Sequence, residues 1–311
     1  MPNFAARSSA SSMLVLPYAV LIGATVEAAR RAVLEESATT MTRPTASTRG
    51  ILGPDAIGRV FTLRRSPPAD DLAHLVERHW VVRWDLGDRP PHRQEVVTHP
   101  CVNLVFEPHG AGVFGVQRRR DSRVLRGSGW AVGVKFRPGG FSGFLGRPVH
   151  EITDRAVSLG DAFGPAGDRL AADAATRPDA DGKIALAEAF LRARLPAPDP
   201  EVQLVHDVVA DMLEVDPGAT VAEIAERHAV STRTLQRLFR RHVGVGPKWV
   251  LRRYRLQEAA EQLAAGERSD WTRLALDLGY FDHAHFIRDF RAVVGRSPAE
   301  YEALCAALAA A

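Results

Sequence analysis

The side chains with the clearest capacity for specific chemistry lie between Ser231 and Val243, in the segment STRTLQRLFRRHV. Ser231 is a favoured N-cap residue, and apolar residues recur behind it every three or four positions, as in a helix with one buried face. The rest of the helix carries polar side chains, namely Arg233, Gln236, Arg237, Arg240 and Arg241. Arginine and glutamine can each form two hydrogen bonds with the edge of a guanine or an adenine in a DNA groove. The segment therefore predicts either a helix that recognises nucleic acid or an ordinary solvated helix of an α-helical domain.

Positive charge is concentrated around this segment. The formal net charge of +3 over 311 residues is weak evidence for any partner. No acidic residue occurs from Ser231 to Gln257, however, whereas the basic residues there are Arg233, Arg237, Arg240, Arg241, Lys248, Arg252, Arg253 and Arg255. We expect this block to form a positive stripe on the surface.

Candidate residues for catalysis or metal binding form no comparable pattern. Six histidines lie in the first half of the chain without the close spacing of two ligands on one strand or helical turn: His74, His79, His92, His99, His109 and His150. Cys101 and Cys305 lie in apolar surroundings, which predicts buried thiols in a reducing cytoplasm, not a disulfide. The sequence therefore predicts no catalytic residue, no metal site and no cofactor.

The first 50 residues do not resemble part of a folded domain. Their one apolar run, Met13 to Val26, is shorter than the roughly 20 residues of a membrane helix, and Pro17 and Gly23 interrupt it. A secretory signal is the weaker alternative, because the preceding charged region is thin. We expect a disordered extension, with Met41 as a candidate for the true translation start, and no membrane association.

Residues 51–195 predict a mainly β domain. A short helix is expected over Asp70–Arg78, and a strand follows in HWVVRWDL. Strands are also expected at Glu95–Thr98, Cys101–Phe106, Gly112–Gln117, Ser122–Leu125 and Trp130–Phe136. Short strands at this spacing, separated by Pro and Gly, indicate a small barrel or sandwich. Helical patterns appear around Phe141–Leu145 and Ile184–Leu191.

A proline-rich linker at residues 196–200 precedes an almost entirely helical region, residues 201–311. An apolar stripe predicts a helix over Glu201–Leu213, and Thr220 with Glu223 forms the pattern of a capping box at the start of the next helix. At about 100 to 200 residues per domain, the length also favours two domains. The expected fold is α+β: a β barrel or sandwich with flanking helices, then an all-α domain.

A repeat within the helical region decides between the two interpretations of the basic helix. The series Ala225, Ala229, Ser231, Leu235, Phe239 recurs as Ala275, Gly279, Asp282, Phe286, Phe290. The offset is 50 residues before the turn and 51 after it, so the second turn holds one extra residue. A solvated helix has no reason to occur twice behind the same turn. The repeat predicts two helix-turn-helix units, the second with the polar residues His283, His285, Arg288 and Arg291.

A long helix is expected between the two units. Pro247 suits its first turn and Gly266 its end. Trp249, Leu256, Ala259 and Leu263 can then pack against both units and set their separation. If both recognition helices enter successive major grooves, they should lie about 34 Å apart. A final helix is expected from Ser297.

Residues 200–302 resemble the DNA-binding domain of the AraC/XylS family of bacterial transcription regulators. The resemblance rests on VSTRTLQRLFRRHVGVGP, on RLQEAAEQL and on ALDLGYFDHAHFIRDFRAVVGRSPAEY. It implies base contacts from Arg233, Gln236 and Arg237, and in the second unit from His283, His285 and Arg288. We expect phosphate contacts from Ser231, Thr232, Arg240, Arg241, Lys248, Arg252 and Arg291. Two departures are Ala229, where the family usually has glycine, and Ala284, which offers only apolar contact.

The N-terminal region is similar, less specifically, to an uncharacterised domain found ahead of some AraC-type DNA-binding domains. The similarity rests on residues 99–106 and 133–146. It implies effector binding or dimerisation, and the sequence lacks the histidine and glutamate spacing of a metal-binding cupin.

The leading hypothesis is therefore a cytoplasmic transcription regulator that binds double-stranded DNA. A small-molecule effector, RNA polymerase and a second copy of the chain stay open as further partners. The alternative is an alkylation-repair enzyme with the same DNA-binding domain, which transfers a methyl group from DNA to a cysteine. That chemistry needs an activated thiolate, which the surroundings of Cys101 and Cys305 do not favour.

Overall fold

The computed structural model describes residues 51–52, 58–214, 218–264 and 271–309. The predicted N-terminal extension with Met41 lies outside these residues, and so does Gly266. None of the helices in the described part of the chain is long and apolar enough to span a membrane.

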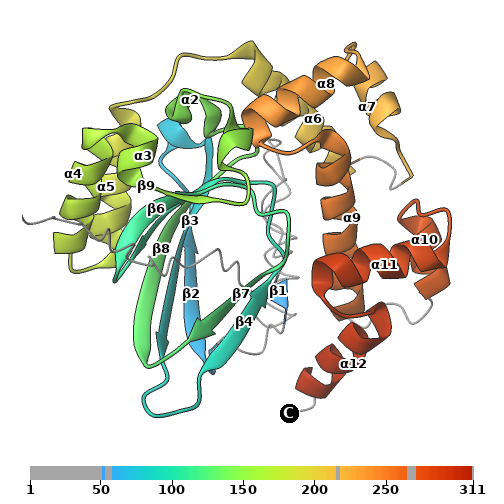
Figure 1. Ribbon diagram of the computed structural model, residues 1–311, viewed down its shortest axis with the longest axis horizontal. Coiled ribbons are helices and arrows are strands. Elements are labelled where there is room, and N and C mark those ends of the chain that lie inside the picture. Colours follow the sequence, from blue (N-terminus) through green and yellow to red (C-terminus); the bar gives the residue numbers. More distant parts are fainter. Residues whose placement is uncertain (1–50, 53–57, 215–217, 265–270, 310–311) are drawn as a thin grey trace, which may run out of the picture.

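The N-terminal region is built on two antiparallel sheets (Figure 1). The larger sheet has the strand order β2 (Phe61–Ser66), β3 (Val76–Asp85), β8 (Ser128–Phe136), β5 (Asn103–Glu107), β6 (Gly110–Phe114) and β9 (Ala156–Ser158). The smaller sheet consists of β1 (Ile51–Leu52), β4 (His92–Val96) and β7 (Asp121–Leu125). The expectation of a mainly β domain is confirmed. Most predicted strand ends differ from the observed ones, although those at Leu125 and Phe136 are correct, and β1, β2 and β9 were not predicted.

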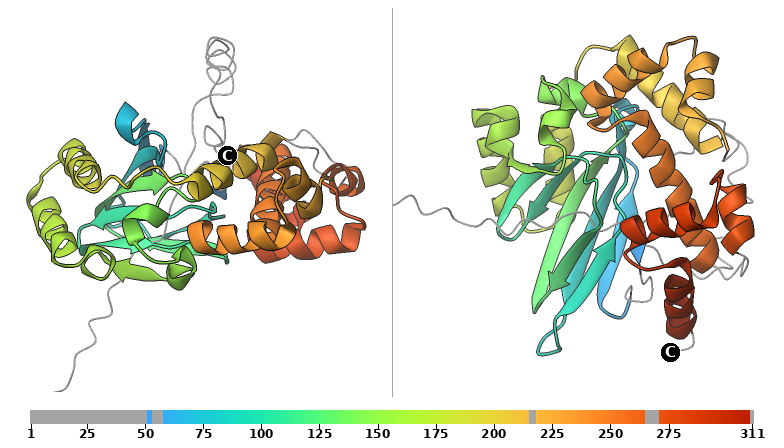
Figure 2. Two further views of the ribbon diagram at one scale, coloured as in Figure 1. Left: turned by 90° about the horizontal axis from the view of Figure 1, so that it is seen from above. Right: turned by 45° about the vertical axis from the view of Figure 1, so that its right-hand side comes forward.

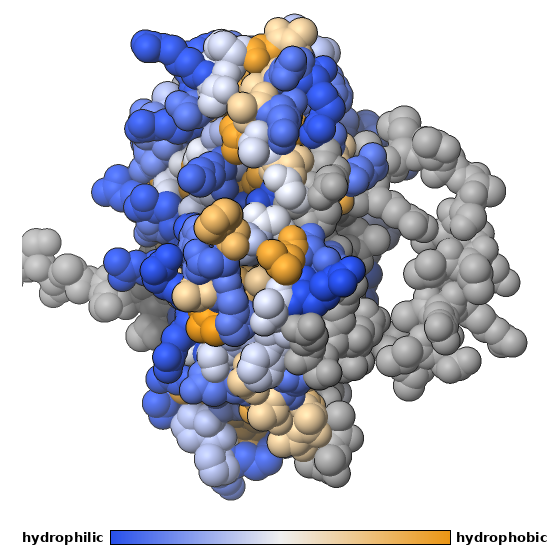
Figure 3. Space-filling model, turned by 90° about the vertical axis from the view of Figure 1, so that its right-hand side faces the viewer, coloured by the Kyte–Doolittle hydropathy of each residue, from blue (hydrophilic) through white to orange (hydrophobic). Residues whose placement is uncertain are grey.

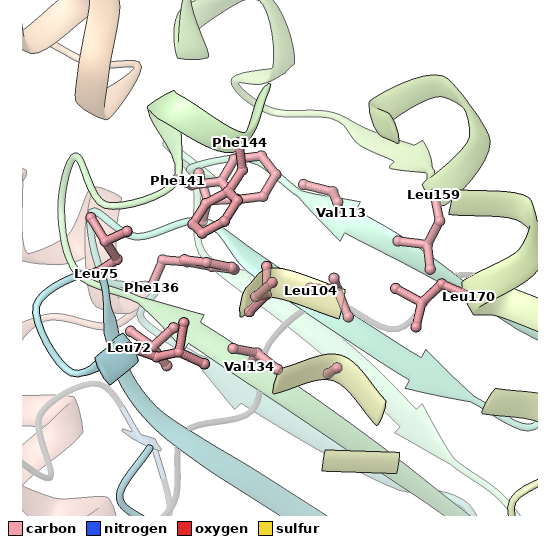
Figure 4. Close-up of a cluster of buried hydrophobic side chains, with 14 of the residues drawn as sticks. Leu72, Leu75, Leu104, Val113, Val134, Phe136, Phe141, Phe144, Leu159 and Leu170 are labelled. Atoms are coloured by element: carbon pink, nitrogen blue, oxygen red, sulfur yellow. The ribbon is translucent and has the colours of Figure 1, made fainter. Parts of the chain in front are cut away.

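Alternating residues of the central strands fill two cores. On β8, Val132, Val134 and Phe136 belong to a cluster that the helices on one side of the large sheet complete. Ala131 points to the opposite face, where Leu125 of the smaller sheet joins a second cluster. Figure 4 shows side chains of the first cluster. Because both faces of the sheet are covered, β3 and β8 carry buried apolar residues on both sides.

The predicted helix over Asp70–Arg78 is wrong in its second half. Only Asp70–Leu72 forms a 3₁₀ turn, η2, and strand β3 begins at Val76. In the sheet, Glu77 is buried and accepts a hydrogen bond from Lys135 Nζ at 2.8 Å. Arg78 Nη2 lies 2.9 Å from the same carboxylate. In the strand, Glu77 therefore has charged partners that offset the cost of its burial.

Residues 142–192 form more helices than the sequence predicts. They are α2 (Ser142–Leu145), η3 (Val149–Ile152), α3 (Leu159–Phe163), α4 (Pro165–Thr176) and α5 (Ala180–Arg192). Local signals start several of them, including a capping box between Ser158 and Asp161 and a proline in the first turn of α4. Small residues dominate α4, so its apolar stripe is weak in the sequence.

The described residues of the C-terminal region form helices joined by short turns, without a strand. Its elements are α6 (Pro200–Glu214), α7 (Val221–Arg227), α8 (Thr232–Leu238), η4 (Phe239–Val243), α9 (Pro247–Ala264), α10 (Trp271–Asp277), α11 (His283–Val294) and α12 (Pro298–Ala309). The chain from Leu195 to Asp199 has no regular structure, and Pro200 is the first residue of α6 and not the last of the linker. These helices lie along one side of the β sheets, with α9 running between α8 and α11 (Figures 1 and 2).

Candidate nucleic-acid interface

The first helix-turn-helix unit is formed by α7 and α8. The predicted capping box is confirmed, since Thr220 accepts a hydrogen bond from the backbone N–H of Glu223 and the Glu223 carboxylate accepts one from Thr220. The Ser231 hydroxyl accepts the N–H of Thr234 at 3.1 Å and so caps α8. Leu235 and Phe239 are fully buried. One face of this recognition helix is therefore held in the core, as the sequence predicts.

This helix is not regular to its end. After Leu238 it continues as a π-helical turn, η4, which Gly244 terminates with a φ of 100°. His242 in this turn is buried. Its ring nitrogens bridge two elements: Nε2 donates to Glu201 at 3.0 Å, and Nδ1 lies 2.9 Å from Ser142 Oγ. The π-helical turn thus contacts both α6 and the N-terminal region.

The second unit repeats the arrangement with α10 and α11. Asp282 caps α11 by accepting the N–H of His285, and Phe286 and Phe290 are fully buried. The turns also match, because Ala229 and Gly279 both have a positive φ, 52° and 72°. The duplicated motif predicted from the sequence is confirmed.

Helix α9 packs against both units. Val250, Leu251 and Tyr254 join the core of the first unit. Farther along the helix, Leu256, Ala259 and Leu263 join the core of the second. A single rigid helix therefore fixes how far apart the two recognition helices lie.

The side chains expected to contact bases differ in exposure. On α8, Arg233, Gln236 and Arg237 are exposed or half-exposed. On α11, Ala284, His285 and Arg288 are exposed, whereas His283 is half-buried. Within the described residues, Nε2 of His283 is shielded from solvent and has no hydrogen-bond partner. The ring of His285 packs edge-on against Tyr280, and its Nε2 lies 3.4 Å from Asp289.

Both recognition helices approach the N-terminal region with their C-terminal ends. Ser142 contacts His242 at the end of the first, and Arg120 Nη1 donates to the carbonyl of Val294, the last residue of α11. Their N-terminal ends, where base contacts are made in helix-turn-helix proteins, are directed away from the β sheets (Figure 1). The side of the molecule seen in Figure 3 is mostly hydrophilic, with hydrophobic side chains in small separate spots.

Glu201 is a residue of this surface that the sequence did not single out. Its carboxylate, at the start of α6, lies 3.1 Å from Arg237 Nη2 and 3.3 Å from Arg241 Nη1. The hydrogen bond from His242, followed by that from Arg237, lowers the pKa of this carboxyl. The local sequence could not predict this ion pair, because residues 201 and 237 come together only when α6 packs beside α8.

The basic stripe is narrower than predicted. Arg240 and Lys248 are exposed, and Arg252 and Arg291 lie 3.5 Å and 3.9 Å from Asp289 and Glu300. Arg253, however, is 2% exposed, and burial lowers its pKa to about 9. Arg255 is half-buried and donates to the carbonyl of Ala219. Both arginines therefore serve structural contacts and do not extend the positive surface.

The described residues contain no group of three or more His, Cys, Asp or Glu side chains that could hold a metal ion. Cys101 and Cys305 are both buried free thiols. Burial raises the pKa of Cys101 to about 12, so its thiolate is strongly disfavoured. This is the reverse of what a methyl-accepting cysteine needs.

Comparison with known families agrees with the division between sheets and helices. Residues 64–158 match a family described as a domain of unknown function (DUF6597). Residues 224–303 match a helix-turn-helix domain.

Curated relatives match over part of their length. The HTH-type transcriptional activator RhaS of Escherichia fergusonii is 40% identical over 77 residues, which cover 25% of this chain and 27% of that protein. A putative AraC-like transcription regulator of Streptomyces lividans is 37% identical over 103 residues, 32% of this chain and 34% of that protein. The chain thus spans about a third or less of the length of these relatives.

Among solved structures, ToxT from Vibrio cholerae O395 aligns with 79% of this chain and 98% of its own, at 8% identity and a TM-score of 0.33. That similarity is too weak to support a shared ligand. The paired capped helices and the family match lead to the same result: residues 224–303 contain a helix-turn-helix domain, similar in sequence to part of AraC-like transcription regulators, and residues 64–158 match a domain of unknown function.

Proposed function

We propose that this protein is a sequence-specific DNA-binding regulator of transcription whose two recognition helices enter successive major grooves. The observation that carries the proposal is the pair of capped helices, α8 and α11, joined by α9 and directed with their N-terminal ends away from the β sheets. Because α9 holds the two recognition helices at a fixed separation, they suit two major grooves on the same side of the duplex, which lie about 34 Å apart.

The two helices have different roles in this proposal. Arg233, Gln236 and Arg237 form hydrogen bonds with bases, and because all three reach solvent the first helix supplies most of the selectivity. His285 and Arg288 contact bases from the second helix, together with His283 once its half-buried ring turns outward. Phosphates are bound by Ser231, Thr232, Arg240, Arg241, Lys248, Arg252 and Arg291.

DNA has to displace Glu201 from Arg237 and Arg241. The two ion pairs are half-exposed, so each stabilises the free protein by only about 0–1 kcal/mol. A phosphate or a guanine edge can replace the carboxylate at small cost. Glu201 therefore acts as a stand-in anion that holds both arginines in place before DNA arrives.

Control by the N-terminal domain is supported by its contacts with both units. Val116 is part of the first unit's core, and Val97 is part of the second unit's core. A cavity of about 480 Å³ lies where this domain meets the linker and α6, lined by His74, His206 and Pro198 among others. A larger cavity of about 750 Å³ beside β2 and the start of α5 has no lining residue from α6–α12. We favour the smaller cavity for a small-molecule effector, because a ligand there would touch both domains. A dimerisation role for the domain is the alternative.

The test compares two arginines of different role. Arg237→Ala should weaken specific binding by about 1–3 kcal/mol and relax the preference at one base pair. Arg252→Ala should weaken binding to all sequences alike and reduce the salt dependence. The measurement is the dissociation constant for a selected site and for random duplex DNA over a range of salt concentrations. If both variants lose equally on specific and random DNA, the assignment of Arg237 to base contact is wrong.

A further inference from the structure

The extra residue of the second turn can be identified from backbone hydrogen bonds. In the first unit, the N–H of Val230 donates to the carbonyl of Ala225 at 3.0 Å. In the second, the N–H of Tyr280 donates to the carbonyl of Ala275 at 2.9 Å. Val230 and Tyr280 therefore occupy the same place. The N-cap Ser231 follows Val230 directly, whereas Phe281 stands between Tyr280 and the N-cap Asp282.

The side chain of Phe281 is almost fully exposed to solvent. Its exposed fraction is 96%, while the neighbouring Tyr280 is 8% exposed and fills the core. The other exposed large hydrophobic residue of this unit is Leu276, at 58%. The packing of the fold does not require a phenylalanine at this inserted position, because the side chain is almost fully exposed and a polar residue would serve equally well. Single exposed apolar side chains are common, but this one stands directly before the N-cap of a recognition helix, at the end that contacts bases in helix-turn-helix proteins, so a bound molecule would cover it.

The surroundings of Phe281 favour DNA as that molecule. Ala284 and Arg288, four residues apart, share one exposed face of α11, and Phe281 stands just before the N-cap at the same end of this helix. In α11, which the structure describes completely, no acidic residue lies in the first turn, and the cap Asp282 is engaged with the N–H of His285. An apolar spot followed by a cation matches a thymine, whose C5-methyl group projects into a major groove bordered by phosphates.

We propose that Phe281 and Ala284 contact the C5-methyl group of a thymine, so that the second unit recognises thymine through an apolar contact. This inference rests on the proposed DNA-binding function. It also gives the two units different chemistry, since the first unit has Arg233 at the position of Ala284 and no counterpart of Phe281. A protein that docks on Phe281 is the competing occupant, and the experiment distinguishes it.

The experiment uses the full chain and a library of random duplex DNA. Sites selected by the unaltered protein are resynthesised with each thymine replaced in turn by deoxyuridine, which lacks only the methyl group. At one thymine in the half of the site bound by the second unit, affinity should fall about fourfold, the effect of one buried methyl group. Phe281→Ser should bind the unaltered site more weakly and be insensitive to deoxyuridine at that position. Leu276→Ser, which changes an exposed side chain on α10, should keep the sensitivity.

The outcomes separate this inference from the function on which it rests. If no sequence is enriched from the library, the proposed DNA-binding function fails. If sites are enriched but no deoxyuridine weakens binding, or if Phe281→Ser keeps the full sensitivity, the thymine contact is wrong. Phe281→Ser binding DNA as well as the unaltered protein would also overturn it, and would point to a protein partner. Because the side chain is exposed, melting temperatures of the variant and the parent should agree, which checks folding.

Discussion

At the scale of single residues, the two turns solve the same problem with different residues. Each turn needs a left-handed backbone between the helices, and the second unit provides it with Gly279. The first unit uses Ala229, whose Cβ makes this conformation unfavourable by about 1–2 kcal/mol. The surrounding caps and buried leucines hold the turn in spite of this strain. Ala229 is therefore a site of stored strain within the first unit.

Ala229→Gly should raise the free energy of unfolding by about 0.5–1 kcal/mol, because relief of the strain exceeds the greater freedom that glycine gives the unfolded chain. The matched change Gly279→Ala should lower it by a similar or larger amount. Urea denaturation of both variants measures these changes. A less stable Ala229→Gly variant would show that the alanine methyl makes a compensating contact.

At the scale of elements, α6 connects three parts of the molecule. Its first turn holds Glu201, which pairs with arginines of the first recognition helix. Its middle carries Val205 and Val209 into the first unit's core, and His206 faces the cavity beside the linker. The pKa of His206 is lowered to about 4, chiefly by burial. Arg137 and His74 contribute to this lowering, whereas Asp207 opposes it. The imidazole is therefore neutral at pH 7.

This shift predicts a pH dependence of stability. The unfolded chain binds a proton at His206 near pH 6.5 and the folded chain only near pH 4, so protonation favours unfolding between these values. The stabilising effect of the neutral ring is complete above pH 6.5 and is lost as the pH falls to 4. At roughly 1.4 kcal/mol per pKa unit, the fall in the free energy of unfolding between pH 7 and pH 4 should be smaller by about 1–3 kcal/mol in His206→Gln than in the unaltered protein. Urea denaturation at pH 7 and pH 4 measures it, with the exposed His150→Gln as control. An unchanged pH profile for His206→Gln would contradict the burial of its ring.

At the scale of the whole molecule, polar contacts join the sheets to the second unit. Glu95 of β4 lies 2.7 Å from both Arg120 and Arg296. Along α9, Arg253 donates to the carbonyl of Arg118 at 2.7 Å, and Gln257 donates to the backbone carbonyls of Val97 and Thr98. Side chains of the helical C-terminal region thus satisfy backbone groups of the N-terminal region.

Glu95→Ala should weaken this docking by about 1–3 kcal/mol, between the values for surface and buried pairs, since Arg120 and Arg296 are left facing each other. Amide hydrogen exchange should then rise at residues 95–98 and 294–296. Glu151→Ala removes an exposed ion pair with Arg147 inside the N-terminal domain and should leave these amides unchanged. Equal exchange in both variants would mean that the apolar contacts of Val97 and Val116 hold the domains together without Glu95.

The sequence by itself determined the duplicated helix-turn-helix, the caps at Thr220, Ser231 and Asp282, and the long helix between the units. These features depend on residues three or four positions apart, and such interactions form within one helix whatever surrounds it. The sequence also indicated a β domain from short β-branched and aromatic runs separated by Pro and Gly, although strand ends were displaced because they depend on pairing partners.

Only the tertiary structure decided which charged residues face solvent. Arg252 and Arg253 are neighbours in the chain, yet one is exposed and the other is buried against the N-terminal domain. Glu77 favours a helix locally but lies in a strand, at the irregular position before Arg78, where it pairs with Lys135. Glu201 meets Arg237 only because two helices pack. Such contacts join residues 36 or more positions apart, and their free energy comes from packing and desolvation that no local pattern records. The exposed Phe281 belongs to both levels: the offset of the repeat locates an extra residue, and the packing of Tyr280 decides that Phe281 is the one left outside.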